Sequence, residues 1–539
     1  VYLMVFCSEY YGQKAEDLHE RERDIKAARG RIIDATGKIL ATNKSVCTIS
    51  VIHSQIDEPE KVIAALQKEL GLTEEEVRKR VEKVSSIERV KTNVDKETGD
   101  RIRAYGLSGI KVDEDYKRYY PLDTMASTVL GFTGADNQGI LGLEVKYDSY
   151  LQGTSGKILT LTDARGIEIE NAGETRLEPV NGYDLYISMD SNIQQYCEQA
   201  AEKAYIKKQA DEVSVIVMNP QNGELMAMVN YPEFNLNEPF TLIEEMGADG
   251  TESADKKQEL LNRMWRNPCI SDTYEPGSTA KPFTVAAALE TGAISPNATF
   301  ECNGSLEVGG HTIRCHNRYD GVLTLQGAVA KSCNVTMMKI GQAMGKEEFC
   351  RYQQIFNFGL RSNVDLAGEA RTASLLFPVD QMGSADLATN SFGQNFNVTM
   401  IQMITGFCSL INGGYYYEPH MVDKITNSNG ATVENIEPRV LRQTISESTS
   451  AKIRQYCRAT VMEEGGDRRT GRTARPAGYA IGGKTGTAET IPRKNGEYVV
   501  SFMGYAPADD PQIAIYVVVD RANASPQDDA KFATGIVRN

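Results

Sequence analysis

The sequence contains no uninterrupted apolar run of about 18 residues, so it predicts no complete transmembrane helix. It has no block of Lys and Arg residues, and a net charge of −15 repels phosphate backbones, which argues against nucleic acid as a partner. Its ten cysteines in 539 residues are too sparse for a disulfide-stapled scaffold. Hydrophobic residues at 41% and charged residues at 24% instead indicate a globular chain of several domains.

The first third of the chain is polar and shows no pattern that carries obvious chemistry. Residues 9–28 are rich in charge at helical spacing, and residues 57–85 fit two amphipathic helices. A strand pair is expected at residues 157–162 and 167–170. This mixture predicts a structural or docking module.

The composition shifts near residue 182, which divides the chain into residues 1–183 and 184–539. The second part begins with a β-hairpin, continues with helices, and ends with strongly β-like segments at residues 498–505 and 512–519. Strands at both ends of a domain, with helices between them, indicate one antiparallel sheet covered by helices. The sequence therefore predicts an α+β fold.

Ser278 and Lys281 lie three residues apart at the start of a segment with helical character. This spacing places both on one helix face, and the preceding Pro276-Gly277 pair places them in the first turn. The helix dipole there favours an alkoxide, and a lysine whose pKa is lowered by burial can act as its base. Taken alone, the pair equally fits a capping serine beside a surface lysine.

Two further motifs follow at long intervals. Ser332 and Asn334 can present a hydroxyl and an amide to one cleft, although an ordinary loop would have the same sequence. The segment Lys484–Thr487 fits an edge strand in which a cation and hydroxyls suit a carboxylate and Gly486 admits a substrate backbone. A β-turn is the alternative, and the spacing does not match a phosphate-binding loop.

The five histidines lie outside these motifs, so a Ser-His-Asp triad is not indicated. Ser-x-x-Lys, Ser-x-Asn and Lys-Thr-Gly in this order are typical of penicillin-recognising acyl-serine enzymes. The chain resembles the class B penicillin-binding proteins, the D,D-transpeptidases of peptidoglycan synthesis, over nearly its whole length, and is closer to their division and sporulation branches. The further segments that carry this resemblance are Arg29–Gly37, Lys117–Pro121, Gly142–Asp148, Tyr274–Ser278, Phe392–Gln402 and Asn412–Gly414.

The resemblance implies the penicillin-binding transpeptidase fold, with a helical subdomain beside the sheet and residues 1–183 as an elongated pedestal or dimerisation-type module. It implies crosslinking of peptidoglycan stem peptides through an acyl-serine intermediate. β-Lactam antibiotics would acylate the same serine and block the reaction. The implied catalytic residues are Ser278 as nucleophile, Lys281 as base, Ser332 as proton relay, Asn334 as holder of the substrate amide and Lys484 as a source of positive field. The implied substrate-binding residues are Thr485, Gly486 and Thr487, and backbone N–H groups of Ser278 and Thr487 form the oxyanion hole.

The first six residues, Val1–Phe6, are apolar and fit either a buried first strand or the stub of a membrane anchor. Because the resembled family has an N-terminal membrane helix, the resemblance favours the anchor. It predicts a single-pass protein of the cell membrane with its catalytic domain on the extracytoplasmic side. A glycosyltransferase of the division or sporulation machinery is the expected partner.

Catalysis by these residues needs no cofactor, but three cysteines between the first two motifs suggest a structural metal. Cys302, Cys315 and Cys333 with one further ligand would make a tetrahedral zinc site, while a Cys302–Cys315 disulfide or three buried thiols are alternatives. Some class B enzymes bind zinc at positions resembling these, with a histidine where this chain has Asp320. The resemblance therefore implies Asp320 as fourth ligand, with His316 as the alternate.

Two other classes of function stay open at this point. A serine β-lactamase or β-lactam sensor of class D would have an aliphatic residue at the position of Asn334 and would lack the long N-terminal module. Rapid turnover of the acyl-enzyme would identify such an enzyme. A catalytically idle scaffold of a division or sporulation complex would not be labelled by a β-lactam at Ser278.

Overall fold

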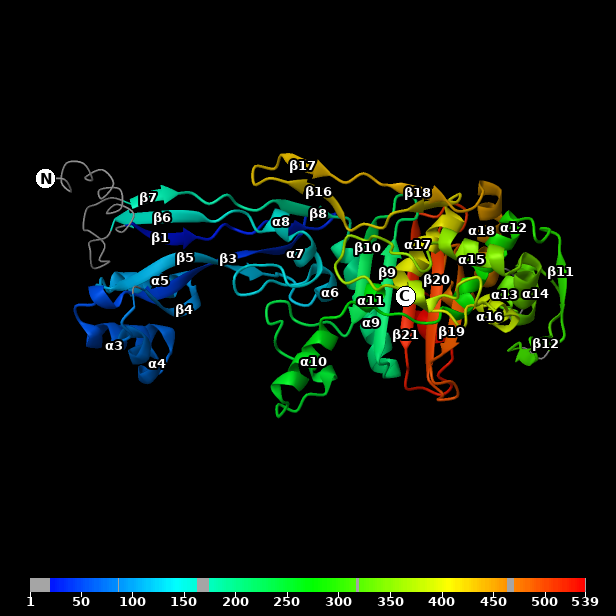
Figure 1. The fold of residues 1–539 in the computed structure, drawn as a ribbon, viewed down its shortest axis with the longest axis horizontal. Coiled ribbons are helices and arrows are strands. Elements are labelled where there is room, and N and C mark those ends of the chain that lie inside the picture. Colours follow the sequence, from blue (N-terminus) through cyan, green and yellow to red (C-terminus); the bar gives the residue numbers. More distant parts are fainter. Residues whose placement is uncertain (1–19, 86, 162–173, 317–318, 463–469, 539) are drawn as a thin grey trace, which may run out of the picture.

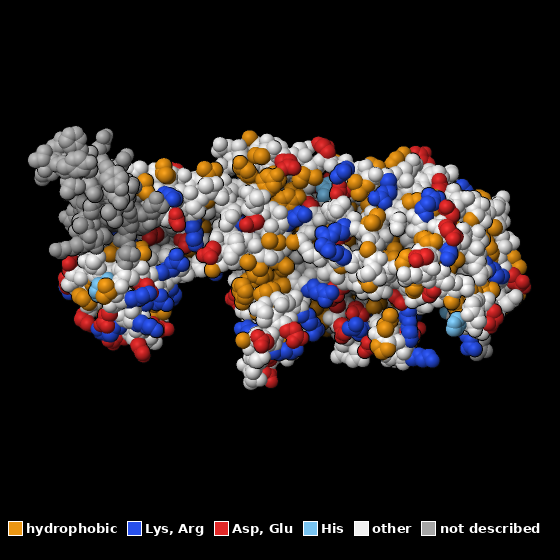
Figure 2. Space-filling model, in the orientation of Figure 1, with side chains coloured by type: hydrophobic (Ala, Val, Ile, Leu, Met, Phe, Trp, Pro, Cys, Tyr) orange, Lys and Arg blue, Asp and Glu red, His pale blue; other side chains and the backbone are white. Residues whose placement is uncertain are grey.

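The structure is a computed structural model that describes residues 20–85, 87–161, 174–316, 319–462 and 470–538. The molecule is elongated, with the N-terminal module at one end and the larger second domain at the other (Figure 1). Charged side chains of both signs are interspersed over the visible face (Figure 2). Within the described ranges, no helix has both the length and the apolar character needed to cross a bilayer. The apolar segment of residues 1–6 lies outside these ranges.

One long strand, β3, organises the far end of the N-terminal module. Helices pack against its sheet and enclose a small apolar core. Both helices predicted within residues 57–85 are confirmed, and Thr73 begins the second with a capping box. The elements are β3 (Ile39–Val51), β4 (Glu88–Asp95), β5 (Ile110–Tyr119), η1 (His53–Gln55), α3 (Pro59–Leu70), α4 (Glu74–Val81) and α5 (Lys96–Ala104).

The helical prediction for residues 9–28 is wrong where the structure describes them. β1 (Glu20–Ile25) is a strand antiparallel to β6 (Gly156–Leu161), which also pairs with β7 (Glu174–Leu177). Backbone pairing with a segment far along the chain outweighs the local charge periodicity here. The predicted strand at residues 167–170 lies outside the described residues.

A sheet continues across the predicted boundary at residue 183. Its strand order is β17-β16-β8-β2-β3-β4, with β5 also paired to β3. β8 (Asp184–Ile187) is parallel to β2 (Ile32–Ile33) and antiparallel to β16 (Val422–Thr426), which pairs with β17 (Thr432–Asn435). The two parts of the chain therefore share backbone hydrogen bonds.

Three polar segments of the N-terminal module meet in a buried ion cluster. Arg29 is 1% exposed, and its guanidinium donates to Glu144 Oε2 at 2.6 Å and to Asp148 Oδ1 at 2.7 Å. Arg118 Nε donates to the other carboxylate oxygen of Glu144 at 2.6 Å, and the Tyr120 hydroxyl donates to that oxygen at 3.2 Å. The buried Glu144 carboxylate thus contacts two guanidinium groups, and Asp148 provides a second carboxylate for Arg29. The short helices of this region are α6 (Ser127–Leu130), α7 (Gly142–Lys146) and α8 (Asp148–Leu151).

The second domain is built on an antiparallel sheet of order β10-β9-β21-β20-β19, which confirms the predicted α+β fold. α9 and α19 cover one face, while α11, α17 and α18 lie on the other. Because both faces are covered, strands such as β9 are apolar along almost their whole length. The elements are β9 (Glu212–Met218), β10 (Leu225–Tyr231), β19 (Gly482–Glu489), β20 (Tyr498–Ala506), β21 (Ile513–Asp520), α9 (Ser191–Lys208), α11 (Pro268–Ser271), α17 (Met400–Ile411), α18 (Glu447–Met462) and α19 (Lys531–Arg538).

A helical subdomain with small β-hairpins completes this domain and lies at the end of the molecule away from the N-terminal module (Figure 1). Its elements are α12 (Lys281–Glu290), β11 (Thr299–Cys302), β12 (Ser305–Val308), β13 (His311–Arg314), β14 (Gly321–Thr324), α13 (Leu325–Ala330), α14 (Asn334–Met344), α15 (Lys346–Ile355) and α16 (Ser384–Asn390). The remaining elements are α10 (Ala254–Met264), β15 (Tyr415–Tyr417), β18 (Val440–Gln443) and the short 3-10 turns η2 (Glu244–Met246), η4 (Ala373–Leu375) and η5 (Arg472–Ala474).

Candidate active site

The serine of the first motif lies in a tight turn at the start of α12. Ser278 belongs to a 3-10 turn, η3 (Gly277–Ala280), and Lys281 is the first residue of α12. Gly277 has φ +58°, and a Cβ there would lie 2.6 Å from the carbonyl oxygen of Thr487. Only glycine fits where this turn meets β19. Ser278 is half-buried, and its hydroxyl makes no hydrogen bond within the described part of the chain.

Lys281 is fully buried and joins the first motif to the second. Its Nζ donates to the backbone oxygen of Ser332 at 2.6 Å, to Ser332 Oγ at 2.9 Å and to Asn334 Oδ1 at 2.7 Å. Ser332 has φ +57°, a left-handed conformation that is uncommon for serine and occurs most often where function requires it. The structure therefore brings Lys281, Ser332 and Asn334 to one point.

Lys484 reaches the same hydroxyl from β19. Its Nζ donates to Ser332 Oγ at 2.9 Å and to the carbonyl oxygen of Thr485 at 3.0 Å. With Lys281 on the other side, both lone pairs of the Ser332 hydroxyl are engaged. Its hydrogen atom therefore remains to be donated to a third group.

Burial lowers the pKa of both amines. Desolvation lowers the pKa of Lys281 to about 8, and Cys315, Cys333 and Asp320 oppose part of this effect. Desolvation lowers the pKa of Lys484 well below its ordinary value, and repulsion from Lys281 adds to the shift. Two ammonium groups around one buried hydroxyl are unfavourable, so a neutral amine is accessible close to neutral pH.

The third motif lies on β19, the edge strand of the five-stranded sheet, as predicted. Thr485 is buried beside Lys484, while Thr487 is partly exposed. A Cβ on Gly486 would lie 2.4 Å from Ser501 Oγ and 3.0 Å from the Thr279 methyl carbon. Glycine at this position is therefore required for packing between β19 and the serine turn, a reason that the sequence did not reveal.

Several contacts that hold the serine turn were not identified by the sequence analysis. Glu275 is 7% exposed, and Arg493 Nη2 donates to its two carboxylate oxygens at 2.6 and 2.5 Å. The backbone N–H of Asn395 donates to Glu275 at 3.0 Å, and the Tyr274 hydroxyl donates to the Tyr516 hydroxyl at 2.6 Å. These partners are 120 to 242 residues apart in the chain, so no local spacing could indicate them.

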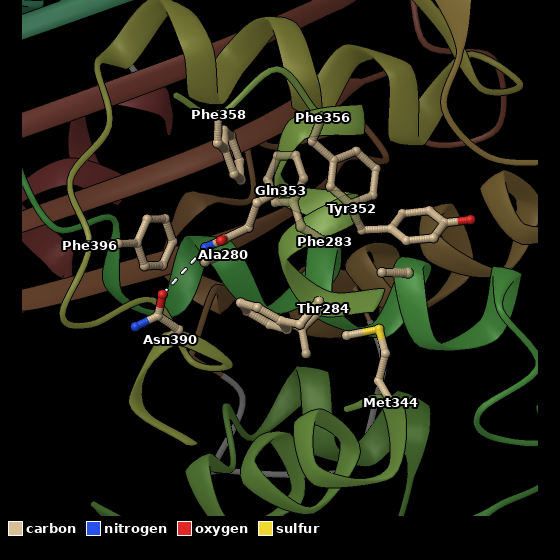
Figure 3. Close-up of a pocket in the computed structure, with 12 residues that line it drawn as sticks. Ala280, Phe283, Thr284, Met344, Tyr352, Gln353, Phe356, Phe358, Asn390 and Phe396 are labelled. Atoms are coloured by element: carbon tan, nitrogen blue, oxygen red, sulfur yellow. Dashed lines mark hydrogen bonds between the residues drawn. The ribbon is translucent and has the colours of Figure 1, made fainter. Parts of the chain in front are cut away.

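Aromatic side chains pack against α12 (Figure 3). The ring of Phe283 packs against Phe356 and Phe358, with centroids 5.2 and 5.1 Å away, and Gln353 donates to Asn390 at 3.4 Å. The cavity left among these side chains is about 20 Å³. That volume holds no peptide, so this region positions the serine turn rather than a substrate.

The structure gathers the predicted metal ligands. One potential ligand atom from each of four residues lies within 4.8 Å of the others, and these residues are Cys302, Cys315, Asp320 and Cys333. They lie at the end of β11, just after β13, just before β14 and at the N-cap of α14. His316, the alternate ligand, is exposed and lies outside this group.

The sulfur atoms of this cluster are also tied to the second motif. Cys333 lies between Ser332 and Asn334, and its Sγ is 4.0 Å from Cys315 Sγ. The backbone N–H of Asn334 donates to Cys315 Sγ at 3.3 Å. The three cysteines are buried and form no disulfide in the structure, so no Cys302–Cys315 bond is present. Three thiols and one carboxylate at this separation match the donor set of a structural zinc site.

An antiparallel sheet with a lysine-paired serine at its edge is the arrangement of penicillin-recognising acyl-serine proteins. The profile of the penicillin-binding protein transpeptidase domain matches residues 213–539, and that of the penicillin-binding protein dimerisation domain matches residues 24–187. The chain therefore belongs to the penicillin-binding proteins that carry a dimerisation domain before a transpeptidase domain.

Individual relatives agree with this assignment. Stage V sporulation protein D of Bacillus subtilis is 36% identical over all of this chain and 81% of its own length. The probable peptidoglycan D,D-transpeptidase PenA of Neisseria meningitidis is 26% identical over 97% of this chain and 85% of its own length. The crystal structure of penicillin-binding protein 2X from Streptococcus thermophilus shares the fold, with TM-score 0.78, 23% identity, and coverage of 96% of this chain and 79% of that one.

Proposed function

We propose that this protein is a peptidoglycan D,D-transpeptidase that crosslinks stem peptides through an acyl-serine intermediate and is acylated by β-lactams. The observation that carries the proposal is the buried contact of Lys281 and Lys484 with one hydroxyl, that of Ser332. A relative matched over 97% of this chain and 85% of its own length is named a probable peptidoglycan D,D-transpeptidase, which supports the same activity.

Acylation begins at Ser278. Its Oγ attacks the carbonyl carbon between the two terminal D-Ala residues, and neutral Lys281 accepts the hydroxyl proton. Backbone N–H groups of Ser278 and Thr487 stabilise the oxyanion, an arrangement whose loss typically costs about 3–4 kcal/mol per donor. A neutral Lys281 is required for this step, and its lowered pKa makes that form accessible.

Departure of the terminal D-Ala requires a proton on its nitrogen. Ser332 donates that proton outward and is replenished from Lys281 or Lys484, both of which contact its Oγ. The amine of a neighbouring stem peptide then attacks the ester, loses its proton along the same route reversed, and restores the Ser278 hydroxyl. The products are one new peptide bond between stems and one free D-Ala.

The terminal carboxylate of the donor stem binds at β19. Lys484 supplies positive potential, and the hydroxyls of Thr485 and Thr487 supply hydrogen bonds, while Asn334 holds the substrate amide. A β-lactam presents a carboxylate and a strained amide to the same groups. When its ring opens, the leaving nitrogen stays tethered to the acyl group, so the site is not cleared for an acceptor stem.

Covalent labelling tests this proposal. Intact-mass measurement after incubation with penicillin should show one adduct on the wild-type protein and none on Ser278→Ala. Persistence of the adduct distinguishes a transpeptidase from a β-lactamase, which would release it quickly. Formation of crosslinked product from a stem-peptide donor and acceptor excludes an idle scaffold, whereas a Ser278→Ala protein that labels at the wild-type rate contradicts the proposal.

We also infer that Cys302, Cys315, Asp320 and Cys333 hold a structural zinc ion. The bound ion would fix the loop that contains Ser332 and Asn334, and it has no part in acyl transfer. Elemental analysis of protein purified without added metal should find about one zinc ion per chain at these residues. Chelation should lower the melting temperature and slow acylation, and metal-free protein with a full thiol count, or a mapped Cys302–Cys315 bridge, would contradict this inference.

Residues 184–539 are inferred to form the catalytic unit, with residues 1–183 as the pedestal. Limited proteolysis should release a fragment that begins at about residue 180 and still labels with penicillin. The shared sheet makes this a demanding test, because cutting there removes β2 from the side of β8. A fragment that unfolds or does not label would show that the catalytic unit depends on the pedestal.

The cellular setting follows from the substrate. Stem peptides are crosslinked outside the cytoplasmic membrane, so the catalytic domain is expected on the extracytoplasmic side, held there by an N-terminal anchor. A glycosyltransferase of the division or sporulation machinery would supply the glycan strands. The whole-length similarity to a sporulation protein favours the sporulation role. Deletion of the gene separates the two roles, because loss of division and loss of spore formation are distinct phenotypes.

A further inference from the structure

The structure contains a second group of potential metal ligands, separate from the cysteine cluster of Cys302, Cys315, Asp320 and Cys333. Glu224 immediately precedes β10, His420 lies two residues before β16, and Asp423 is the second residue of β16. The backbones of Glu224 and His420 are joined by a β-bridge. One ring nitrogen of His420 and one carboxylate oxygen from each acid lie within 4.8 Å of one another.

The histidine of this cluster is buried with an unused nitrogen. His420 is only 7% exposed, and its Nδ1 lies 3.3 Å from the carbonyl oxygen of Glu418. If Nδ1 donates to that carbonyl, the lone pair of the ring lies on Nε2. Among the described residues, no donor forms a hydrogen bond with Nε2. Metal-binding histidines are oriented in this way, with the second ring nitrogen donating to a backbone carbonyl or carboxylate.

A carboxylate oxygen of the same cluster is also without a partner. Asp423 Oδ1 is inaccessible to solvent and has no hydrogen-bond partner in the described part of the chain. Buried polar atoms in native proteins are nearly always paired, so this unpaired oxygen in a group of potential metal ligands indicates a missing ligand.

The charges around the cluster favour a cation. No Lys or Arg within the described ranges forms a salt bridge with Glu224 or Asp423. The neighbouring Lys424 places its amine 4.5 Å from the centre of the Tyr186 ring. Glu224 and Asp365 add negative potential at the Asp423 carboxylate, and Lys424 adds positive potential. A bound cation would relieve the repulsion between the carboxylates.

A third carboxylate stands behind the cluster but is already satisfied. Asp365 accepts the backbone N–H groups of Met421 and Val422 at 2.7 and 2.9 Å, and the Tyr147 hydroxyl at 2.9 Å. Tyr147 belongs to the N-terminal module, so Asp365 fastens the His420–Asp423 segment to that module. It adds negative potential without occupying the position between the three ligand atoms.

We propose that Glu224, His420 and Asp423 bind a divalent transition-metal cation through one imidazole nitrogen and two carboxylate oxygens. This donor set suits Zn²⁺ or Mn²⁺ and contains no thiolate, unlike the cysteine cluster. The ion ties the start of β10 to the segment entering β16, and β16 lies beside β8 at the junction of the two parts of the chain (Figure 1). Its role is to hold this junction, and the proposal is independent of the transpeptidase assignment.

Manganese is the probe that separates this site from the cysteine cluster, because Mn²⁺ prefers oxygen and nitrogen ligands to thiolates. The full-length protein is stripped with a chelator, and bound Mn²⁺ is counted by electron paramagnetic resonance during titration. Wild-type protein should bind about one Mn²⁺ per chain, with a rise in melting temperature. His420→Gln and Asp423→Asn should each weaken binding by about 10- to 100-fold.

His53→Gln is the matched control. The Nδ1 of His53 also lies near a backbone carbonyl, that of Val81 at 3.0 Å, but no carboxylate cluster includes this histidine. This variant should bind Mn²⁺ like the wild type. Glu224 is half-buried, so Glu224→Gln should disturb folding less than the other two substitutions. Circular dichroism shows whether each variant is folded.

Two results would overturn the proposal. One is a folded wild-type protein that binds no Mn²⁺ and whose melting temperature the ion does not change. The other is equal binding by the wild type and by folded Glu224→Gln, His420→Gln and Asp423→Asn. Zinc counted in the same proteins provides a second arm. Loss of one zinc ion on Asp423→Asn with retention of the cysteine-bound ion supports this site, whereas loss of zinc only on Cys333→Ser excludes Zn²⁺ from it.

Discussion

The N-terminal module and the transpeptidase domain both bury strong charges, but they treat them in opposite ways. In the module, the guanidinium groups of Arg29 and Arg118 are compensated by the carboxylate of Glu144. In the catalytic domain, Lys281 and Lys484 are both fully buried and face each other across one hydroxyl, and neither amine forms an ion pair with a described residue. The ion pairs keep the guanidinium groups and the carboxylate charged, whereas the lysine amines lose their positive charge more easily.

The difference separates a structural use of buried charge from a catalytic one. A buried ion pair keeps both partners ionised, and removing one partner leaves the other uncompensated. Burial without an ionic partner lowers the pKa of an amine, so the neutral amine can act as a base. Three substitutions test this contrast, in order of decreasing expected effect.

Replacement of Lys281 by Ala should have the largest effect. Removing the general base should slow acylation by penicillin about 10³-fold or more, since such groups contribute about 10²- to 10⁴-fold. Rapid-quench mass spectrometry measures the rate. Lys339→Ala is the control, because its amine only donates to a backbone carbonyl, that of Glu301. Equal acylation rates for Lys281→Ala and the wild type would contradict the assignment of Lys281 as the general base.

Replacement of Glu144 by Gln should break the structural half. Arg118 and Arg29 would lose the Glu144 carboxylate, and only Arg29 would keep an ion pair, with Asp148. This loss should lower the free energy of unfolding by about 3–5 kcal/mol. Denaturant unfolding measures this change, and the penicillin acylation rate of the folded protein should stay at the wild-type value. Glu60→Gln, which removes an exposed partner of Arg78, should leave stability unchanged. A stable Glu144→Gln protein would show that the cluster does not hold the module.

Replacement of Ser332 by Ala should have a smaller effect than loss of Lys281. The relay disappears while both amines remain, so acylation should slow about 10²-fold. Stopped-flow measurement with a chromogenic β-lactam gives the rate, and Ser305→Ala on the exposed β12 strand serves as control. If Ser332→Ala is slower than Lys281→Ala, the order of roles given to these two residues is reversed.

The catalytic motifs were predictable from the sequence because each is short and local. Ser278 and Lys281 share a turn, and the Lys484–Thr487 segment lies on one strand, so their spacing alone indicates a common face. The sheet was predictable for a similar reason, since β9, β20 and β21 are mostly apolar. The four predicted metal ligands also converge, although the sequence could not set their separation.

The remaining features depend on contacts between distant segments. The pairing of Glu275 with Arg493 spans 218 residues, and that of Arg29 with Glu144 spans 115. β1 is a strand only because β6 lies beside it. Charge periodicity describes one segment at a time, so it could not reveal these partners. The same limit hid the cluster of Glu224, His420 and Asp423, whose members come from two distant parts of the chain.

The pH dependence of acylation tests the central claim most directly. Burial lowers the pKa of Lys281 to about 8, and the neutral amine that acts as base is the form present above that pKa. The second-order rate constant for penicillin acylation of Ser278 should therefore rise with pH and level off, with an apparent pKa of about 8. The measurement uses the full chain and a β-lactam that does not itself titrate in this range. A rate that is independent of pH across this range, or that falls as pH rises, would contradict the account.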